Sequence, residues 1–107
     1  MPTKKIQRLL HEINKHLKPK YGKRLKGVVL YGSEARGESN PESDIDVLVL
    51  LDDKVNYGKD LLKNISLLYP LSQKLGRRIS PKPVSEEEYD KVQCPLYLNA
   101  HREGVRI

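Results

Sequence analysis

The sequence has few of the residues that mark specialised protein classes. It contains one cysteine, Cys94, and neither phenylalanine nor tryptophan. A single cysteine excludes an internal disulfide and a cysteine metal cluster. No apolar run approaches the ~20 residues needed to span a bilayer, and the basic N-terminus lacks the apolar core of a signal peptide. We therefore expect a cytoplasmic protein without a membrane partner.

Charge is plentiful but unevenly distributed. The chain has 107 residues and a net charge of +6. This length predicts one domain over residues 1–107. Residues 1–26 carry nine Lys or Arg against one acid, whereas residues 34–60 carry eight Asp or Glu against three basic residues. An acidic segment in a basic protein indicates a cation site beside a surface that attracts anions. The simpler alternative for the N-terminal lysines is a solvated helix face.

The first half of the sequence predicts one helix and two strands. Thr3 can cap a helix with one apolar stripe, which we expect Pro19 and Gly22 to end. "LKGVVLY", residues 25–31, has the β-branched character of a strand. "DIDVLVLLDD", residues 44–53, is a second strand. Its apolar residues occupy both side-chain parities, so its far part should be covered on both faces.

The second half predicts helices around a weaker strand. A helix over 57–75 should be kinked or split by Pro70. We expect its core face to comprise Leu61, Leu62, Ile65, Leu68 and Leu75. Two prolines restrict the strand-like residues 77–85 to a sheet edge. Ser85 with Glu88 forms a capping box for a short helix, and a last helix should run from Pro95 to Gly104. The order α-β-β-α-β-α indicates an α+β or mixed α/β domain.

Two aspartates at the start of the second strand suggest a metal site. Asp44 and Asp46 are two residues apart, so they share one strand face with Cα atoms ~6.6 Å apart. Two such carboxylates can hold Mg²⁺, which prefers oxygen ligands and keeps waters and substrate phosphates in its other positions. Asp-x-Asp at a strand start is also a common solvated cap.

The turn after the first strand suggests a phosphate site. Gly32 lets a phosphate approach the backbone. Ser33 can cap a short helix over "SEARG", whose N-terminus attracts anions. Arg36 could supply a charged fork to a phosphate. Each feature alone is ordinary, but their combination with Asp44 and Asp46 is specific.

Over about 20 residues, "GSEARGESNPESDIDVLVLL" resembles the signature of the nucleotidyltransferase superfamily related to DNA polymerase β. The short chain looks like a minimal nucleotidyltransferase, which is a catalytic core with a small mixed sheet packed with helices. The resemblance implies that Gly32 and Ser33 contact nucleotide phosphates and that Asp44 and Asp46 bind Mg²⁺. Many minimal members are antitoxins of HEPN-domain ribonucleases. The resemblance therefore implies AMP transfer from ATP to a tyrosine of such a partner.

The match to this family lacks one element, a third carboxylate from a later strand. The corresponding residues 77–84 contain no acid, and Glu86, Glu87 and Glu88 should lie in the first turn of a helix. Two interpretations stay open: a transferase with two carboxylates, or an antitoxin that neutralises its partner by binding alone. A basic nucleic-acid binder using residues 1–26 is a weaker third hypothesis, since the acidic segment would repel phosphates and no base-reading motif is present.

Overall fold

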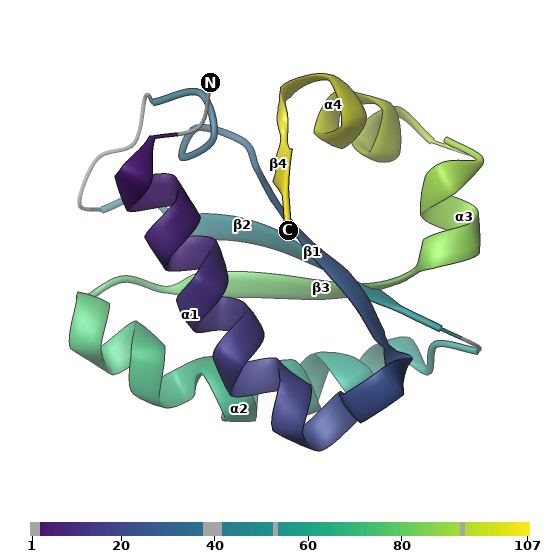
Figure 1. Cartoon of the computed structure of the whole chain (residues 1–107), viewed down its shortest axis with the longest axis horizontal. Helices are drawn as coiled ribbons and strands as arrows, with labels where there is room; N and C mark the ends of the chain where they lie inside the picture. The colour runs from purple at the N-terminus through teal and green to yellow at the C-terminus, as the bar shows by residue number, and fades with distance from the viewer. Residues whose placement is uncertain (1–2, 38–41, 53, 93) are drawn as a thin grey trace.

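A four-stranded mixed sheet with helices on both faces forms the protein (Figure 1). The structure is a computed structural model, and it describes residues 3–37, 42–52, 54–92 and 94–107. The helices are α1 (Lys4–Tyr21), α2 (Tyr57–Leu75), α3 (Glu86–Asp90) and α4 (Pro95–Glu103), with a 3-10 turn η1 (Gly22–Arg24). The strands are β1 (Leu25–Tyr31), β2 (Ile45–Leu51), β3 (Ile79–Ser85) and β4 (Val105–Arg106).

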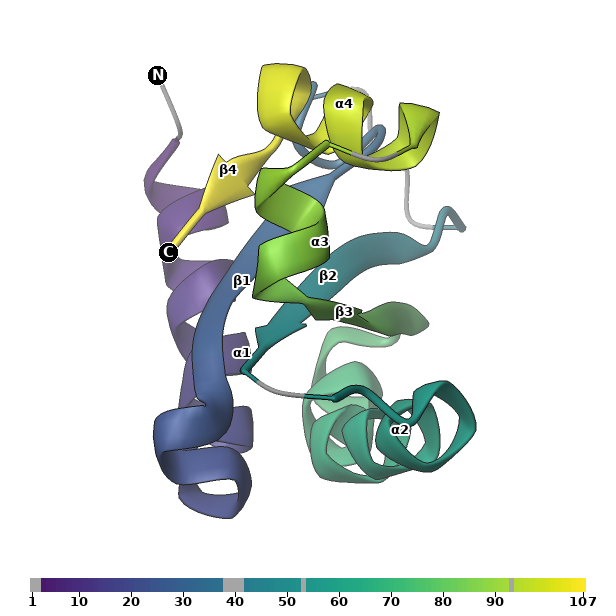
Figure 2. The same ribbon diagram turned by 90° about the vertical axis from the view of Figure 1, so that its right-hand side faces the viewer.

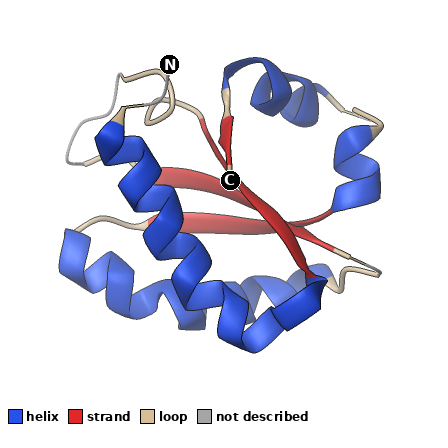
Figure 3. Ribbon diagram, in the orientation of Figure 1, coloured by secondary structure: helices blue, strands red, loops and turns tan. Residues whose placement is uncertain are grey.

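The strand order β3-β2-β1-β4 confirms the expected mixed fold (Figure 3). Strand β1 is antiparallel to β2 and to β4, while β2 is parallel to β3. The first strand has the expected bounds, and the proline-containing β3 lies at the sheet edge as expected. Strand β4 was not predicted, because two residues carry no periodicity. Within the described ranges, no helix combines the length and apolar character that a membrane crossing needs.

Two hydrophobic clusters fill the two faces of the sheet. Figure 2 shows α3 and α4 on the side of the sheet away from α1 and α2. The larger cluster joins α1 and α2 to one face. Its most buried members include Leu10, Ile13, Leu17, Val28, Leu30, Val47, Val49 and Leu68. The smaller cluster joins α3 and α4 to the other face, through Tyr89 and Ala100 packed on Val29, Leu48 and Leu50. Asp46 shares this second face, because side chains alternate along β2.

Strand β2 is the most buried element. Residues 47–51 are all buried, which confirms the expectation that both faces are covered. The strand begins at Ile45, so Asp44 lies just before it rather than in it. It ends at Leu51, and of the two residues expected beyond, Asp52 is not in the strand and Asp53 lies outside the described residues.

Neither helix proline ends or splits its helix, contrary to that part of the expectation. Helix α1 continues through Pro19 to Tyr21 and ends only at Gly22, whose φ is 56°. Helix α2 runs without a break through Pro70 to Leu75. Both prolines are exposed. On the solvent side, water can satisfy the carbonyl that a proline leaves without its helical partner, which makes these positions tolerable.

The expected core face of α2 was wrong. Leu68 is buried as expected, but Leu62 is 69% exposed and Ile65 is 45% exposed. The buried positions of the same helix include the polar residues Asp60 and Asn64. Because Asp60 and Asn64 occupy buried positions, the spacing of the apolar residues alone does not identify the face of α2 that packs against the core.

A buried polar contact fixes α2 against the rest of the fold. The Tyr21 hydroxyl donates to Asn64 Oδ1, and Asn64 Nδ2 donates to the Pro81 carbonyl at 3.1 Å. Burial first, and then the charge of Asp60, raise the pKa of Tyr21 to about 12. The phenol therefore stays protonated and keeps its donor. Asn64 thus joins α1, α2 and the edge strand β3.

We expect Asn64→Ala to lower the free energy of unfolding by roughly 2–4 kcal/mol, because it leaves the Tyr21 hydroxyl and the Pro81 carbonyl without their partner. Urea unfolding followed by circular dichroism measures this change. Asn99→Ala is the matched control, since Asn99 is an exposed residue of α4, and it should change stability by less than about 0.5 kcal/mol. Equal losses in the two variants would contradict the structural role of Asn64.

Candidate active site

The turn after β1 packs directly against Asp46. Gly32 has a φ of 75°, and a Cβ built on it would lie 2.7 Å from Asp46 Oδ2. Any other residue would therefore be strained and would collide with the carboxylate. This contact arises because Tyr31, the last residue of β1, pairs with Asp46 on β2. The structure brings Gly32 and Asp46 together, as the sequence analysis expected.

Asp44 and Asp46 lie near each other at the start of β2. Asp44 is exposed and Asp46 is half-buried. Burial raises the pKa of the Asp46 carboxyl, the Lys82 ammonium opposes that rise, and the negative charge of Asp44 adds to it. The two carboxylates therefore interact electrostatically, as ligands of a common cation would.

The residues of the glycine turn differ from the expectation in two ways. Residues 32–37 form hydrogen-bonded turns and not the expected short helix. A helix does not propagate here, because Gly32 and Gly37 both have positive φ angles. Arg36 donates to the Glu103 carboxylate of α4 at 3.0 Å, so its guanidinium points to that helix.

A buried ion pair joins the glycine turn to the aspartates. Arg77 Nη1 lies 2.7 Å from Glu34 Oε1, and the two side chains are only 13% and 5% exposed. The same guanidinium donates to the Ser43 carbonyl at 3.1 Å and to the Ser43 hydroxyl at 3.2 Å. Ser43 directly precedes Asp44. The sequence analysis missed this clamp, although an acid inside a glycine turn was a signal that could have indicated it.

Lys82 and Tyr31 complete the surroundings of Asp46. Lys82 lies on β3, where it pairs with Leu48 of β2. Burial raises the pKa of the Tyr31 phenol, the Lys82 ammonium opposes this, and Asp46 adds to it. Lys82 occupies the strand on which a third carboxylate was sought. Within the described residues, no group of three or more His, Cys, Asp or Glu could hold a metal ion.

The donor set fits one hard divalent cation. The carboxylates of Asp44 and Asp46 offer the oxygen ligands that Mg²⁺ prefers, and phosphates with water can fill the remaining positions. Gly32 leaves room for the Asp46 carboxylate, which a side chain at that position would displace.

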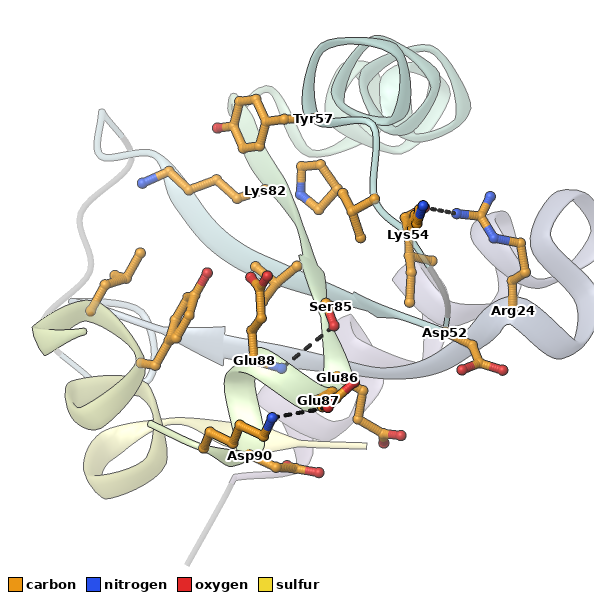
Figure 4. A pocket seen from close by; sticks show the side chains of 17 residues that line it. Arg24, Asp52, Lys54, Tyr57, Lys82, Ser85, Glu86, Glu87, Glu88 and Asp90 are labelled. Carbon is orange, nitrogen blue, oxygen red and sulfur yellow. Dashed lines mark hydrogen bonds and ion pairs between the residues drawn. The ribbon is translucent and has the colours of Figure 1, made fainter. Parts of the chain in front are cut away.

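A hollow of about 1690 Å³ opens next to Lys82 (Figure 4), and none of the predicted site residues Gly32, Ser33, Arg36, Asp44 and Asp46 lines it. Tyr57 and Lys82 lie at one end, and Arg24 and Asp52 lie at another. Ser85 caps α3 by accepting from the Glu88 amide at 3.4 Å, so Glu86, Glu87 and Glu88 occupy a first helical turn as expected. Lys82 belongs both to this hollow and to the surroundings of Asp46.

Comparison with known proteins identifies the family. The family model described as nucleotidyltransferase domain matches residues 10–98. A curated relative from Methanocaldococcus jannaschii, called "Putative protein adenylyltransferase MJ0604", is 34% identical over 99 residues, which cover 92% of this chain and 93% of the relative. The chain belongs to the nucleotidyltransferase domain family. The prediction that it is a nucleotidyltransferase is thereby confirmed.

Other relatives of this nucleotidyltransferase agree in family and fold. "Putative protein adenylyltransferase MJ1379", from the same archaeon, is 38% identical over 74 residues, covering 69% of this chain and 70% of the relative. A crystal structure titled as a toxin–antitoxin with AMP-PNP superposes with a TM-score of 0.64 at 21% identity, covering 90% of this chain and 69% of that one. A mutant of the toxin–antitoxin MntA–HpeT gives 0.63 at 21% identity, with coverage of 91% and 69%. These structures share the fold.

We expect Asp46→Asn to raise the melting temperature of the nucleotidyltransferase near neutral pH without metal or nucleotide. Burial raises the pKa of Asp46 in the folded state, so its charge destabilises the fold above that pKa. The gain should shrink as pH falls through the raised pKa, because the wild-type carboxyl then takes up its proton. Scanning calorimetry across pH measures this. Glu87→Gln on α3, an exposed acid, should show no such gain, and a loss of stability in Asp46→Asn would contradict the prediction.

We expect Arg77→Met to destabilise the fold by about 3–5 kcal/mol, because it leaves Glu34 buried without this partner. The double variant Glu34→Gln, Arg77→Met should recover part of that loss, since no buried charge then remains at the pair. Arg36→Met breaks the exposed pair with Glu103 and is the matched control, with an expected loss below about 1 kcal/mol. Chemical denaturation of the wild type and these three variants tests the set, and a double variant no more stable than Arg77→Met would contradict the coupling of Glu34 with Arg77.

Proposed function

We propose that this nucleotidyltransferase is a Mg²⁺-dependent protein adenylyltransferase that acts as an antitoxin in the cytoplasm. It transfers AMP from ATP to a tyrosine of a partner ribonuclease toxin with a HEPN domain. The observation that supports this most directly is the Asp46 carboxylate packed on the Gly32 turn, with Asp44 beside it. This arrangement supports a cation site next to a phosphate site.

The comparisons support the substrates from two directions. Two relatives carry the name of protein adenylyltransferases, which favours a protein acceptor and an adenylyl donor. The neighbouring folds come from toxin–antitoxin crystals, one of them with AMP-PNP, which favours ATP as donor and a toxin as acceptor. The HEPN domain of the partner and the tyrosine acceptor are inferred from the resemblance of this sequence to the minimal nucleotidyltransferases.

The chain's residues divide the work between binding and orientation. Gly32 and Ser33 seat the β- and γ-phosphates, and the missing side chain of Gly32 permits close approach. Asp44 and Asp46 hold the cation, and Glu34 with Arg77 keeps both parts in register. Arg36 would exchange its exposed pair with Glu103 for a phosphate, which costs little because such pairs contribute at most about 1 kcal/mol.

The transfer is a substitution at the α-phosphorus. A bond forms between the tyrosine oxygen and this phosphorus, and the bond to the bridging oxygen of the β-phosphate breaks. The electron pair leaves with pyrophosphate, and the phenolic proton goes to solvent. A bound Mg²⁺ would neutralise phosphate charge during this step. The protein positions the α-phosphate for in-line attack.

A second candidate is an antitoxin that neutralises its partner by binding alone. The observation in its favour is the lysine, rather than an acid, on β3 beside Asp46. It predicts that neutralisation survives the loss of both aspartates.

If a short helical protein with an Arg-x₄-His motif is encoded next to this chain, it is the partner to test. We expect incubation with Mg-ATP to add AMP to a tyrosine of that protein and to block its ribonuclease activity. The double variant Asp44→Asn, Asp46→Asn should lose transfer at least ~100-fold, since metal contributions amount to several kcal/mol. Intact-mass and peptide mass spectrometry measure the adduct.

The control is Asp52→Asn, which changes an exposed acid that lies beyond the other end of β2. It should transfer AMP at the wild-type rate. Undiminished transfer by the double variant would contradict the roles of Asp44 and Asp46. Neutralisation without any adduct, in the wild type and the double variant alike, would establish the binding-only candidate instead.

A further inference from the structure

Lys82 lies on the active face of the sheet, one strand away from Asp46. Strand β3 is parallel to β2, and Asp46 pairs with Ser80 while Leu48 pairs with Lys82. Because paired residues share a face, Ser80, Lys82 and Asp46 lie on the same side of the sheet. The opposite face of β3 is filled by Ile79, which packs in the α1–α2 core.

The Lys82 side chain points into the hollow on this face of the sheet. Figure 4 shows it extending from β3 at the end of the hollow where Tyr57 lies, away from Glu86 and Asp90. The strand register places Lys82 on the same face as Asp46, and in agreement with this the ammonium opposes the rise in the pKa of both Asp46 and Tyr31. A fixed positive charge therefore adjoins the carboxylate on its β3 side.

The Tyr31 hydroxyl gives an independent indication of a ligand. Tyr31 is 8% exposed, and in the described part of the chain its hydroxyl makes no hydrogen bond of normal geometry. The Lys82 ammonium acts on this oxygen as a hydrogen-bond donor outside normal geometry, but an ammonium cannot accept, so the proton of the hydroxyl has no acceptor among the described residues. Buried hydroxyls are normally satisfied, so an oxygen of a bound molecule is the partner that this position lacks.

These positions leave room for only one divalent ion. A second ion beside Asp46 would need another anionic ligand on the β3 side, where the described residues offer an ammonium and no third carboxylate. Like charges at such short range repel strongly. The ion that Asp44 and Asp46 hold lies on the side of Asp46 away from β3, where both carboxylates can bind it.

We propose that this nucleotidyltransferase works with a single divalent cation, and that the Lys82 ammonium, with the Tyr31 hydroxyl, binds the α-phosphate oxygens of the nucleotide where a second ion would otherwise sit. This inference rests on the proposed function, because it concerns the same nucleotide. In the transfer, the Lys82 side chain acts through its charge and forms no covalent bond. It stabilises the charge on the α-phosphate while the tyrosine–phosphorus bond forms and pyrophosphate leaves with the electron pair.

The test counts metal ions and requires neither an acceptor nor turnover. The protein is saturated with α,β-methylene-ATP, which cannot release pyrophosphate, and is titrated with Mn²⁺ while free Mn²⁺ is followed by electron paramagnetic resonance. We expect one tightly bound ion per protein–nucleotide complex in the wild type and two in Lys82→Asp, where a carboxylate replaces the ammonium. Lys54→Asp makes the same charge change elsewhere in the hollow and should keep one ion.

Two neutral variants test the phosphate contact separately. Lys82→Met should keep one ion but bind α,β-methylene-ATP about 10–100-fold more weakly, because a charge-assisted contact is lost. Tyr31→Phe should weaken the nucleotide by a smaller factor and leave the melting temperature unchanged or higher, since it removes a buried hydroxyl without a partner. Isothermal titration and thermal unfolding measure these changes.

The outcomes separate this inference from the proposed function. Two ions in the wild type, or one ion in a folded Lys82→Asp, would overturn the single-cation site even if AMP transfer is observed. Unchanged nucleotide affinity in Lys82→Met would overturn the phosphate contact. One ion in the wild type would support the inference even if no tyrosine of the toxin is modified. A wild type that binds no nucleotide would overturn both proposals.

Discussion

The pairing of Tyr31 with Asp46 across β1 and β2 is the constraint on which the active site depends. A shift of one residue would turn Asp46 into the α1–α2 core and Val47 out to the active face. The register resists such a shift because residues 47–51 are buried on both faces. The same pairing brings the Gly32 backbone against the Asp46 carboxylate, where no side chain would fit. The register of β1 and β2 therefore determines both the packing of the core and the geometry of the site.

The Glu34–Arg77–Ser43 clamp adds a second constraint to the first. It ties Glu34 of the glycine turn to Ser43, the residue before Asp44. Arg77 lies just before β3, and its guanidinium binds Glu34 in the glycine turn and Ser43 before β2. Three segments that are separate in sequence therefore meet at this group. A planar group with several donors suits this role, because it can bind a carboxylate and a carbonyl at once. The clamp is buried, whereas Arg36 forms an exposed pair whose loss costs little.

Sequence reasoning predicted local structure well where a pattern and a stop signal agreed. Strand β1 and the capping of α3 by Ser85 follow from such agreement. It failed at α2, where Asp60 and Asn64 face inwards and several leucines face out. That face is decided by the Tyr21 hydroxyl and the Pro81 carbonyl, which are distant in sequence. Strand β4 was missed for a similar reason, since two residues become a strand only when β1 offers its edge.

The sequence alone predicted Gly32, Ser33, Asp44 and Asp46 as the residues of a nucleotidyltransferase motif, because their residue types and spacing are local features of a strand, a turn and the next strand. It also showed that residues 77–84 contain no acid. Only the tertiary structure decided what stands beside Asp46 instead. The parallel pairing of β3 with β2 places Lys82 on the active face, and the end of β1 places the buried Tyr31 hydroxyl there. Such neighbours are set by strand register across the sheet, which no spacing along the chain encodes.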